Sequence, residues 1–174
     1  MPEEIQLFHA AVRKHSYEHS SDRTQKVPKG FTETDREIMS NYLGDGFRNT
    51  NLQLRAGNSA AGYHLRGTLS KFDPYTGIGF RGVDFPDGIL ELYQRGNIVT
   101  EKGFVSASKH LEGAKPQPTL IRVLSKTGRD VSEYSQKYHR EAEFIFLPNT
   151  SFLVLDRQNP TRHDERTILD IMEL

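Results

Sequence analysis

Two glutamates at the start of an apolar segment carry the clearest chemistry in the sequence. Glu141 and Glu143 stand two residues apart and lead into the apolar residues 144–147. Because side chains alternate along a strand, an extended backbone would place both carboxylates on one face, roughly 6 to 7 Å apart. Like charge and burial would make ionisation of both costly, which favours a catalytic pair. The alternative is an exposed strand end whose acids pair with Arg140 and Lys137.

Two earlier segments supply groups that suit a phosphate or a sugar hydroxyl. Arg81 lies between Gly79 and Gly82, where the missing side chains allow a ligand to approach the backbone closely. The planar guanidinium can donate two parallel hydrogen bonds to a phosphate. Ser106 and Ser108 place two hydroxyls on one face of a predicted strand. Taken singly, the arginine would be a surface ion-pair partner and the serines strand-edge residues.

The elements that must position these groups are short strands in the second half of the chain. Aromatic and β-branched residues alternate there with glycine and proline turns, which is typical of strands. We predict strands over residues 78–83, 103–108, 119–124, 142–147, 151–155 and 167–172. No regular alternation of strands with helices is present, so the pattern favours an α+β domain with an antiparallel or mixed sheet.

Helices are predicted mainly before these strands. The polar residues 1–30 contain one short amphipathic run followed by a linker. Thr34 is the predicted N-cap of the next helix, with Glu37 three residues later as its capping-box partner. Gly44 and Gly46 should break that helix, and a second helical stretch should continue to Arg55. A further helical segment is predicted at 89–95.

Length and composition indicate one catalytic domain with local recognition. The chain has 174 residues, with 23 basic and 23 acidic side chains and no cysteine. Such balance provides no global field for nucleic acid or a membrane, and we expect neither as a partner. No apolar run approaches a membrane span or a signal peptide. His15 and His19 are four apart, but no further ligand supports them, so we expect no metal.

The order of these motifs resembles the Arg-Ser-Glu class of ADP-ribosyltransferases, which includes bacterial toxins. An aromatic-Arg-Gly, an aromatic-x-Ser-x-Ser and a Glu-x-Glu follow one another, although Ala107 replaces the middle threonine of the family's second motif. Residues 42–44, with Asn51 and Arg55 after them, resemble the family's helical signature. Residues 128–131, with Tyr134 and Tyr138 after them, resemble the loop before its catalytic glutamates. The resemblance covers residues 31–174, which we expect to be the catalytic domain, and leaves 1–30 as an N-terminal segment or linker.

The resemblance implies two small packed sheets around an NAD+ cleft, with NAD+ as co-substrate. Glu143 would stabilise the positive charge that forms on the ribose when nicotinamide leaves. Arg81 would bind the pyrophosphate or the ribose side of NAD+, and Gly82 would offer backbone groups to the nicotinamide amide. Ser106 would hold Glu143 and the ribose in register, supported by Ser108.

The same resemblance implies an arginine as acceptor. In this family a glutamate at the position of Glu141 accompanies arginine targets, since a carboxylate pairs well with a guanidinium. The loop 130–140, with Tyr134 and Tyr138, should contact the target, while His139 is expected to be a surface histidine. Arg55 and Asn51 are further candidates for NAD+ binding, and residues 113–118 for a mobile loop over nicotinamide.

The implied role is a toxin or effector that a secretion system delivers into the cytoplasm of another cell, for example a competing bacterium. A toxin active on its maker would also need an immunity protein. Two alternatives remain open at this point. One is an NAD+ glycohydrolase or a transferase acting on nucleic acid, and the other is a β-rich binding module without catalysis.

Overall fold

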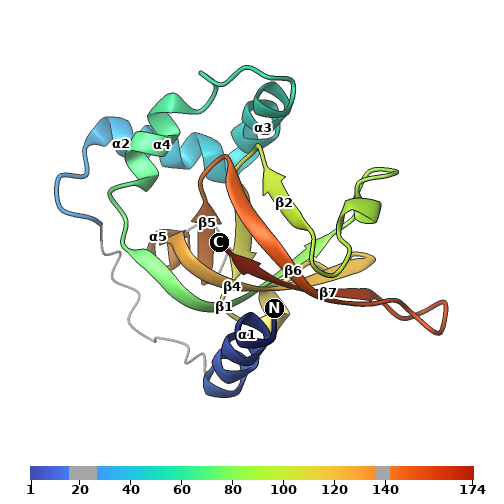
Figure 1. The fold of residues 1–174 in the computed structure, drawn as a ribbon. Helices are drawn as coiled ribbons and strands as arrows, with labels where there is room; N and C mark the ends of the chain where they lie inside the picture. The colour runs from blue at the N-terminus through green and yellow to red at the C-terminus, as the bar shows by residue number, and fades with distance from the viewer. Residues whose placement is uncertain (16–26, 136–141) are drawn as a thin grey trace.

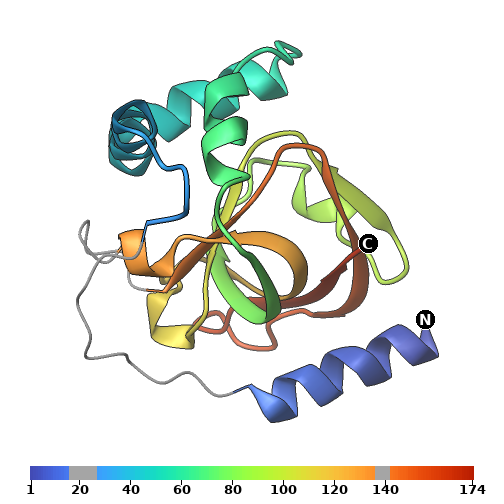
Figure 2. The ribbon, with the colours of Figure 1, turned by 90° about the vertical axis from the view of Figure 1, so that its left-hand side faces the viewer.

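The chain folds into an α+β domain in which helices lie on two sides of a curved sheet. The computed structural model describes residues 1–15, 27–135 and 142–174. In Figures 1 and 2, α2, α3 and α4 form a group at one end of the sheet, and α1 lies on the opposite side. The helices of the described chain are α1 (Pro2–Lys14), α2 (Glu33–Asn41), α3 (Phe47–Arg55), α4 (Tyr63–Leu69) and α5 (Ser132–Ser135). Its strands are β1 (Pro74–Val83), β2 (Ile98–Glu101), β3 (Val105–Ser108), β4 (Thr119–Asp130), β5 (Glu143–Phe146), β6 (Thr150–Gln158) and β7 (Thr167–Glu173).

The start of α2 corrects the predicted cap. Thr32, rather than Thr34, is the N-cap: its Oγ1 accepts from the N–H of Asp35 at 3.2 Å, and Oδ2 of Asp35 accepts from the N–H of Thr32 at 2.8 Å. Both Thr-x-x-acid patterns fit a capping box, so local sequence could not choose between them. Contacts from α4 and the residues after it decide the choice. Thr68 and Lys71 each donate to the Asp35 carboxylate at 2.6 Å.

The break between α2 and α3 falls where the glycines predicted it. Gly44 has φ −78° and ψ −122°, which no helix continues through. A Cβ on Gly46 would lie 2.6 Å from the side-chain oxygen of Asn41 and 2.8 Å from its carbonyl oxygen. The kink turns α3 across the end of the sheet, and α3 then ends at Arg55 as predicted.

The predicted strands are all present, and the structure differs from the prediction at β2, at residues 89–95 and at the end of β4. β2 was missed because it is short and pairs only with β6 among the described strands. The helix predicted at 89–95 shortens to one 3₁₀ turn, Leu90–Leu92, which leaves too few residues for a stable α-helix. β4 extends to Asp130, well beyond the predicted end at 124.

The strands form one connected sheet rather than two separate ones. Their order is β1-β3-β5-β4-β7-β6-β2, and β1 also pairs with β4. The two small sheets expected from the sequence are therefore two arms, β1-β3-β5 and β7-β6-β2, that meet at β4. A core of aromatic and aliphatic residues from both arms packs between them, including Phe144, Phe146, Phe152 and Val154.

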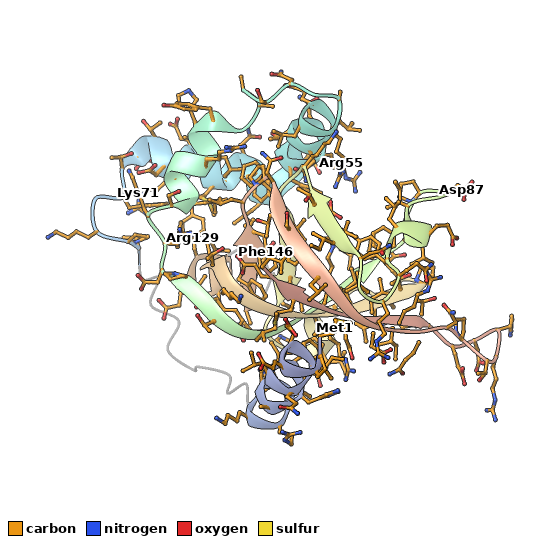
Figure 3. All side chains as sticks on the ribbon, in the orientation of Figure 1. Met1, Arg55, Lys71, Asp87, Arg129 and Phe146 are labelled. Atoms are coloured by element: carbon orange, nitrogen blue, oxygen red, sulfur yellow. The ribbon has the colours of Figure 1, made fainter. Side chains whose placement is uncertain are left out.

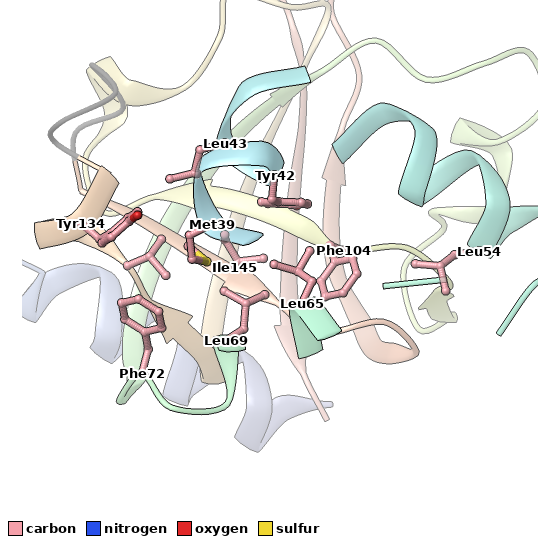
Figure 4. Packing of buried hydrophobic residues seen from close by; sticks show 11 residues of the cluster. Met39, Tyr42, Leu43, Leu54, Leu65, Leu69, Phe72, Phe104, Tyr134 and Ile145 are labelled. Atoms are coloured by element: carbon pink, nitrogen blue, oxygen red, sulfur yellow. The ribbon is translucent and has the colours of Figure 1, made fainter. Parts of the chain in front are cut away.

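Two further cores attach the helices. Figure 4 shows Phe104 and Ile145 from the sheet side among Tyr42, Leu65 and other residues of the helical group. On the opposite side, Phe8 of α1 is 1% exposed and packs in a cluster with Ile78, Leu155 and Met172. The first helix is therefore part of the packed structure, while the division at residue 30 stays a prediction. No helix among the described residues is long and apolar enough to cross a membrane.

Candidate active site

A cavity of about 500 Å³ brings together the residues that the three sequence motifs singled out. Its lining includes Arg81 and Gly82 of β1, Ser106 and Ser108 of β3, and Glu143 of β5. The strand register places them there: β3 pairs with β1 on one side and with β5 on the other, and Ser108 stands directly opposite Glu143. Residues that are up to 62 positions apart in the sequence, since 143 − 81 = 62, thus share one wall.

The alternation of β3 separates its polar and apolar side chains. Ser106 and Ser108 line the cavity, and so does Ala107, which together with Val105 also belongs to the core between the two arms. Ala107, which replaces the family's threonine, is thus a core residue that also borders the cavity.

Glu143 is the first residue of β5 and is 6% exposed. The residue before it, Ala142, has a left-handed backbone with φ 57°. A strand cannot run through such a residue, so the predicted strand 142–147 begins one residue later, at Glu143. The extended backbone assumed between the two glutamates therefore does not hold at Ala142, and the placement of the Glu141 carboxylate stays a prediction. Glu141 itself lies outside the described residues, as do Tyr138 and His139.

Arg81 lies where three cavities meet. It lines the cavity of Glu143, an adjoining pocket of about 330 Å³ with Asn51 and Arg55, and a larger apolar cavity of about 630 Å³. Its Nη1 donates to the carbonyl oxygen of Ser106 at 2.9 Å, which fixes the side chain against β3. Burial lowers the pKa of Arg81, opposed by the charge of Glu101, but a guanidinium remains charged in proteins. The arrangement presents a partly buried cation to the cavities, which suits an anion.

Asn51 links the helices to the strand that carries the serines. Its Nδ2 donates to the carbonyl of Phe104 at 3.1 Å, and its Oδ1 accepts from the N–H of Phe104 at 2.8 Å. A Cβ on Gly103 would come within 2.7 Å of the same amide oxygen, so glycine permits this approach. In this structure the amide of Asn51 supports β3, whereas Arg55 is exposed at the end of α3 near β2 (Figure 3).

The segment after β3 lies over the cavity. His110, Glu112, Gly113 and Lys115 all line it. A Cβ on Gly82 would overlap the carbonyl oxygen of Lys115, and one on Gly113 would overlap Oγ of Ser108. The two glycines thus allow the segment to lie directly on the wall of the site. The mobility expected for residues 113–118 stays a prediction.

His110, Phe47 and Phe80 belong to the cavity but were missed from the sequence. The N–H of His110 donates to Oγ of Ser108 at 3.3 Å, and its Nδ1 lies 3.1 Å from Oε2 of Glu112. No spacing rule links a histidine after a strand to a site, so only the return of the segment over β3 reveals it.

Tyr134 lies elsewhere than expected. It is 3% exposed, its hydroxyl donates to the carbonyl of Arg36 at 3.3 Å, and its ring packs against Phe31 and Phe72. The aromatic surface of the helical group buries this side chain, so the structure does not support its expected contact with a protein target. Its role here is to hold α5 against α2.

Comparisons with known proteins agree with this geometry. No sequence-family model matches the chain. Mav of Mycobacterium avium, a putative NAD(+)–arginine ADP-ribosyltransferase, is 32% identical over 148 residues, which cover 80% of this chain. Tre1 of Serratia proteamaculans, an NAD(+)–protein-arginine ADP-ribosyltransferase, is 36% identical over 104 residues, or 58% of this chain. The chain belongs to the bacterial ADP-ribosyltransferases.

Solved structures show the fold of this family in the chain. The ADP-ribosyltransferase Vis in complex with agmatine, from Vibrio splendidus, superposes with a TM-score of 0.68 at 20% identity. The match covers 98% of this chain and 86% of the Vis chain. The chain spans only 18% of the length of Mav and 22% of that of Tre1, so it corresponds to a small part of those relatives.

Proposed function

We propose that this chain cleaves NAD+ and transfers its ADP-ribose to an arginine of a target protein, releasing nicotinamide. The observation that carries the proposal is the single cavity shared by Arg81, Ser106, Ser108 and Glu143. Mav and Tre1 are both named as arginine ADP-ribosyltransferases, which supports the acceptor. The Vis complex with agmatine, a small guanidine, supports it further.

The cavities suggest how NAD+ would lie. A dinucleotide has a charged centre and two flat ends, and Arg81 occupies the point where three cavities meet. We place the pyrophosphate at Arg81, with Arg55 as a second cation nearby. The nicotinamide ribose would then reach Ser106 and Glu143, and the adenine would extend toward the apolar cavity.

Glu143 would act at the reacting carbon. Loss of nicotinamide leaves positive charge on the ribose, and a fixed carboxylate stabilises such a transition state more strongly in a partly buried site than in water. Because Ser108 stands opposite Glu143 in the sheet, the position of this carboxylate is set by backbone pairing rather than by a loop. Glu141 remains the candidate that orients the incoming guanidinium.

The decisive experiment supplies the purified chain with labelled NAD+ and agmatine, and measures nicotinamide release and labelled agmatine separately. Both products are expected from the wild type. Release of nicotinamide without labelled agmatine or any labelled protein of a lysate would favour the glycohydrolase, and labelled nucleic acid would identify a different acceptor. If neither product forms, the chain is not this enzyme.

The cellular role extends this proposal. Vis is described as a toxin, and we propose that this domain likewise acts in the cytoplasm of a target cell after delivery from its producer. An immunity protein that covers the cavity would protect the producer, including in competition between bacteria. Mass spectrometry of a treated lysate would identify both the modified protein and its arginine.

A further inference from the structure

Lys109 contacts both ends of the connection between β4 and β5. It directly follows β3, and its backbone N–H donates to the carbonyl of Ala142 at 2.8 Å. Its Nζ donates to Oδ2 of Asp130 at 2.5 Å and to Oγ of Ser132 at 3.1 Å. Asp130 ends β4, Ser132 begins α5, and Ala142 directly precedes β5. One residue therefore holds the chain where it leaves β4 and where it enters β5.

Further hydrogen bonds close this cluster. Oδ1 of Asp130 accepts from the N–H of Ser132 at 3.1 Å and from its Oγ at 2.5 Å. The N–H of Val131 donates to the carbonyl of Glu143 at 3.2 Å. Each oxygen of the Asp130 carboxylate thus has a donor, and the cluster fixes the relative positions of β4, α5 and β5.

The surroundings of Lys109 hold its side chain in one arrangement. The side chain is 15% exposed, and its Nζ lies 4.9 Å from the ring centre of Tyr75. Burial, with a smaller contribution from the charge of Asp130, raises the pKa of Tyr75 to about 12. An ion pair that is shielded in this way and carries several hydrogen bonds holds one arrangement, whereas exposed pairs contribute little.

We propose that Lys109 is a positioning residue for the transfer of ADP-ribose to arginine. Its side chain fixes Asp130 and Ser132 before the segment whose sequence includes Glu141, and its backbone N–H holds Ala142 after that segment. The inference rests on the proposed function, because it concerns the acceptor step. Ala142 and Glu143 are held by backbone hydrogen bonds to Lys109 and β3, which a substitution of the Lys109 side chain keeps, so cleavage of NAD+ should depend less on that side chain.

The test compares two rates in Lys109→Met: nicotinamide release from NAD+ alone, and labelling of agmatine. Because small displacements of a reacting group have large effects on rate, we expect agmatine labelling to fall roughly tenfold or more, with nicotinamide release within about threefold of wild type. Lys109→Arg, which keeps the charge, should recover part of the lost labelling. An unchanged ratio of the two rates in Lys109→Met would overturn the inference.

Lys71→Met is the matched control. It breaks the pair between Lys71 and Asp35, a hydrogen-bonded ion pair of 2.6 Å that lies in the helical group. This variant should lose stability without a change in the ratio of agmatine labelling to nicotinamide release. If that ratio changed as much as in Lys109→Met, Lys109 would act only through stability. If Lys109→Met does not fold, Ser132→Ala removes one arm of the cluster and should shift the ratio in the same direction. A wild type that releases no nicotinamide would refute the proposed function, whereas an active wild type with unresponsive variants refutes only the role of Lys109.

Discussion

At the scale of single residues, none of the side chains of the site indicates a function by itself. An arginine flanked by glycines, two alternating serines and a glutamate are common in strands, and only their order in the sequence pointed to NAD+ chemistry. The structure adds that Arg81, Ser106 and Glu143 share one cavity. It also adds His110, which no motif contains.

Replacement of Glu143 tests the catalytic role at this scale. Glu143→Gln keeps the size of the side chain but removes the charge, so we expect nicotinamide release and agmatine labelling to fall together, by roughly a hundredfold or more. Initial rates at saturating NAD+ measure the loss. Glu91→Gln, at an exposed position on the turn before β2, is the control and should keep full activity. A Glu143→Gln variant that keeps both activities would contradict the catalytic role given to Glu143.

Glu141 should behave differently from Glu143. Glu141→Gln removes the carboxylate expected to orient the guanidinium, but leaves the group that stabilises the ribose. We expect nicotinamide release to persist at about the wild-type order of magnitude while agmatine labelling is lost. Both rates should be measured on one preparation. Equal loss of the two activities would contradict this division of roles.

At the scale of elements, the helical group depends on one buried carboxylate. Asp35 caps α2 and also accepts hydrogen bonds from Thr68 and Lys71. Burial opposes its ionisation, but the hydrogen bonds from Lys71, Thr68 and Thr32 outweigh it and lower the pKa of Asp35 in the folded chain. The Asp35 carboxylate therefore caps α2 and also joins it to α4 and to the residue Lys71 after α4.

Asp35→Asn should reduce the free energy of unfolding by about 2 kcal/mol near neutral pH, because it removes a charge-assisted network. Since the folded pKa is lowered, the stabilisation is present above the unfolded pKa of about 4 and is lost as the pH falls below it. The difference between wild type and variant should consequently shrink in acid, as urea unfolding between pH 7 and pH 3 would show. Glu37→Gln alters the predicted cap partner instead and should change stability little. A similar loss in both variants would argue against the observed cap.

At the scale of the whole molecule, three cores hold two sheet arms and two sets of helices together. The first helix shares its core with β1, β6 and β7, although the sequence resemblance begins only at residue 31. Phe80, which lines the candidate active site, also packs at the margin of this core. Stability of α1 and shape of the cavity are therefore connected through β1.

Phe8→Ala tests whether α1 folds cooperatively with the rest. Truncation of a side chain that is 1% exposed should lower the free energy of unfolding by about 3 kcal/mol, measured by urea unfolding with intrinsic fluorescence and circular dichroism. Leu7→Ala is the matched control on the same helix, where the leucine is 61% exposed, and should change it by less than about 0.5 kcal/mol. If the two variants were equally stable, α1 would not fold cooperatively with the rest of the domain. The catalytic domain would then begin near residue 30, as the sequence predicts.

Several features follow from the sequence because their physics is local. The helical backbone breaks at Gly44 and α3 runs to Arg55, and alternation places Ser106 and Ser108 on one face. Strands rich in aromatic and β-branched residues were recognised from five or six residues each. The order of the motifs, from Arg81 to Glu143, identified the family before any tertiary contact was known.

Only the tertiary structure could decide the features that depend on distant partners. Asp35 rather than Glu37 completes the cap because α4 supplies Thr68, and Tyr134 is buried because Phe31 and Phe72 pack around it. The left-handed backbone of Ala142 ends the alternation assumed for the two glutamates. The sequence by itself predicted which groups would meet NAD+, since that prediction depends on the types of the side chains and on their order. The fold decided that β5 begins at Glu143 and that Lys109 bonds to Asp130 and Ser132, because hydrogen bonds between β3, β4 and β5 join residues that are far apart along the chain.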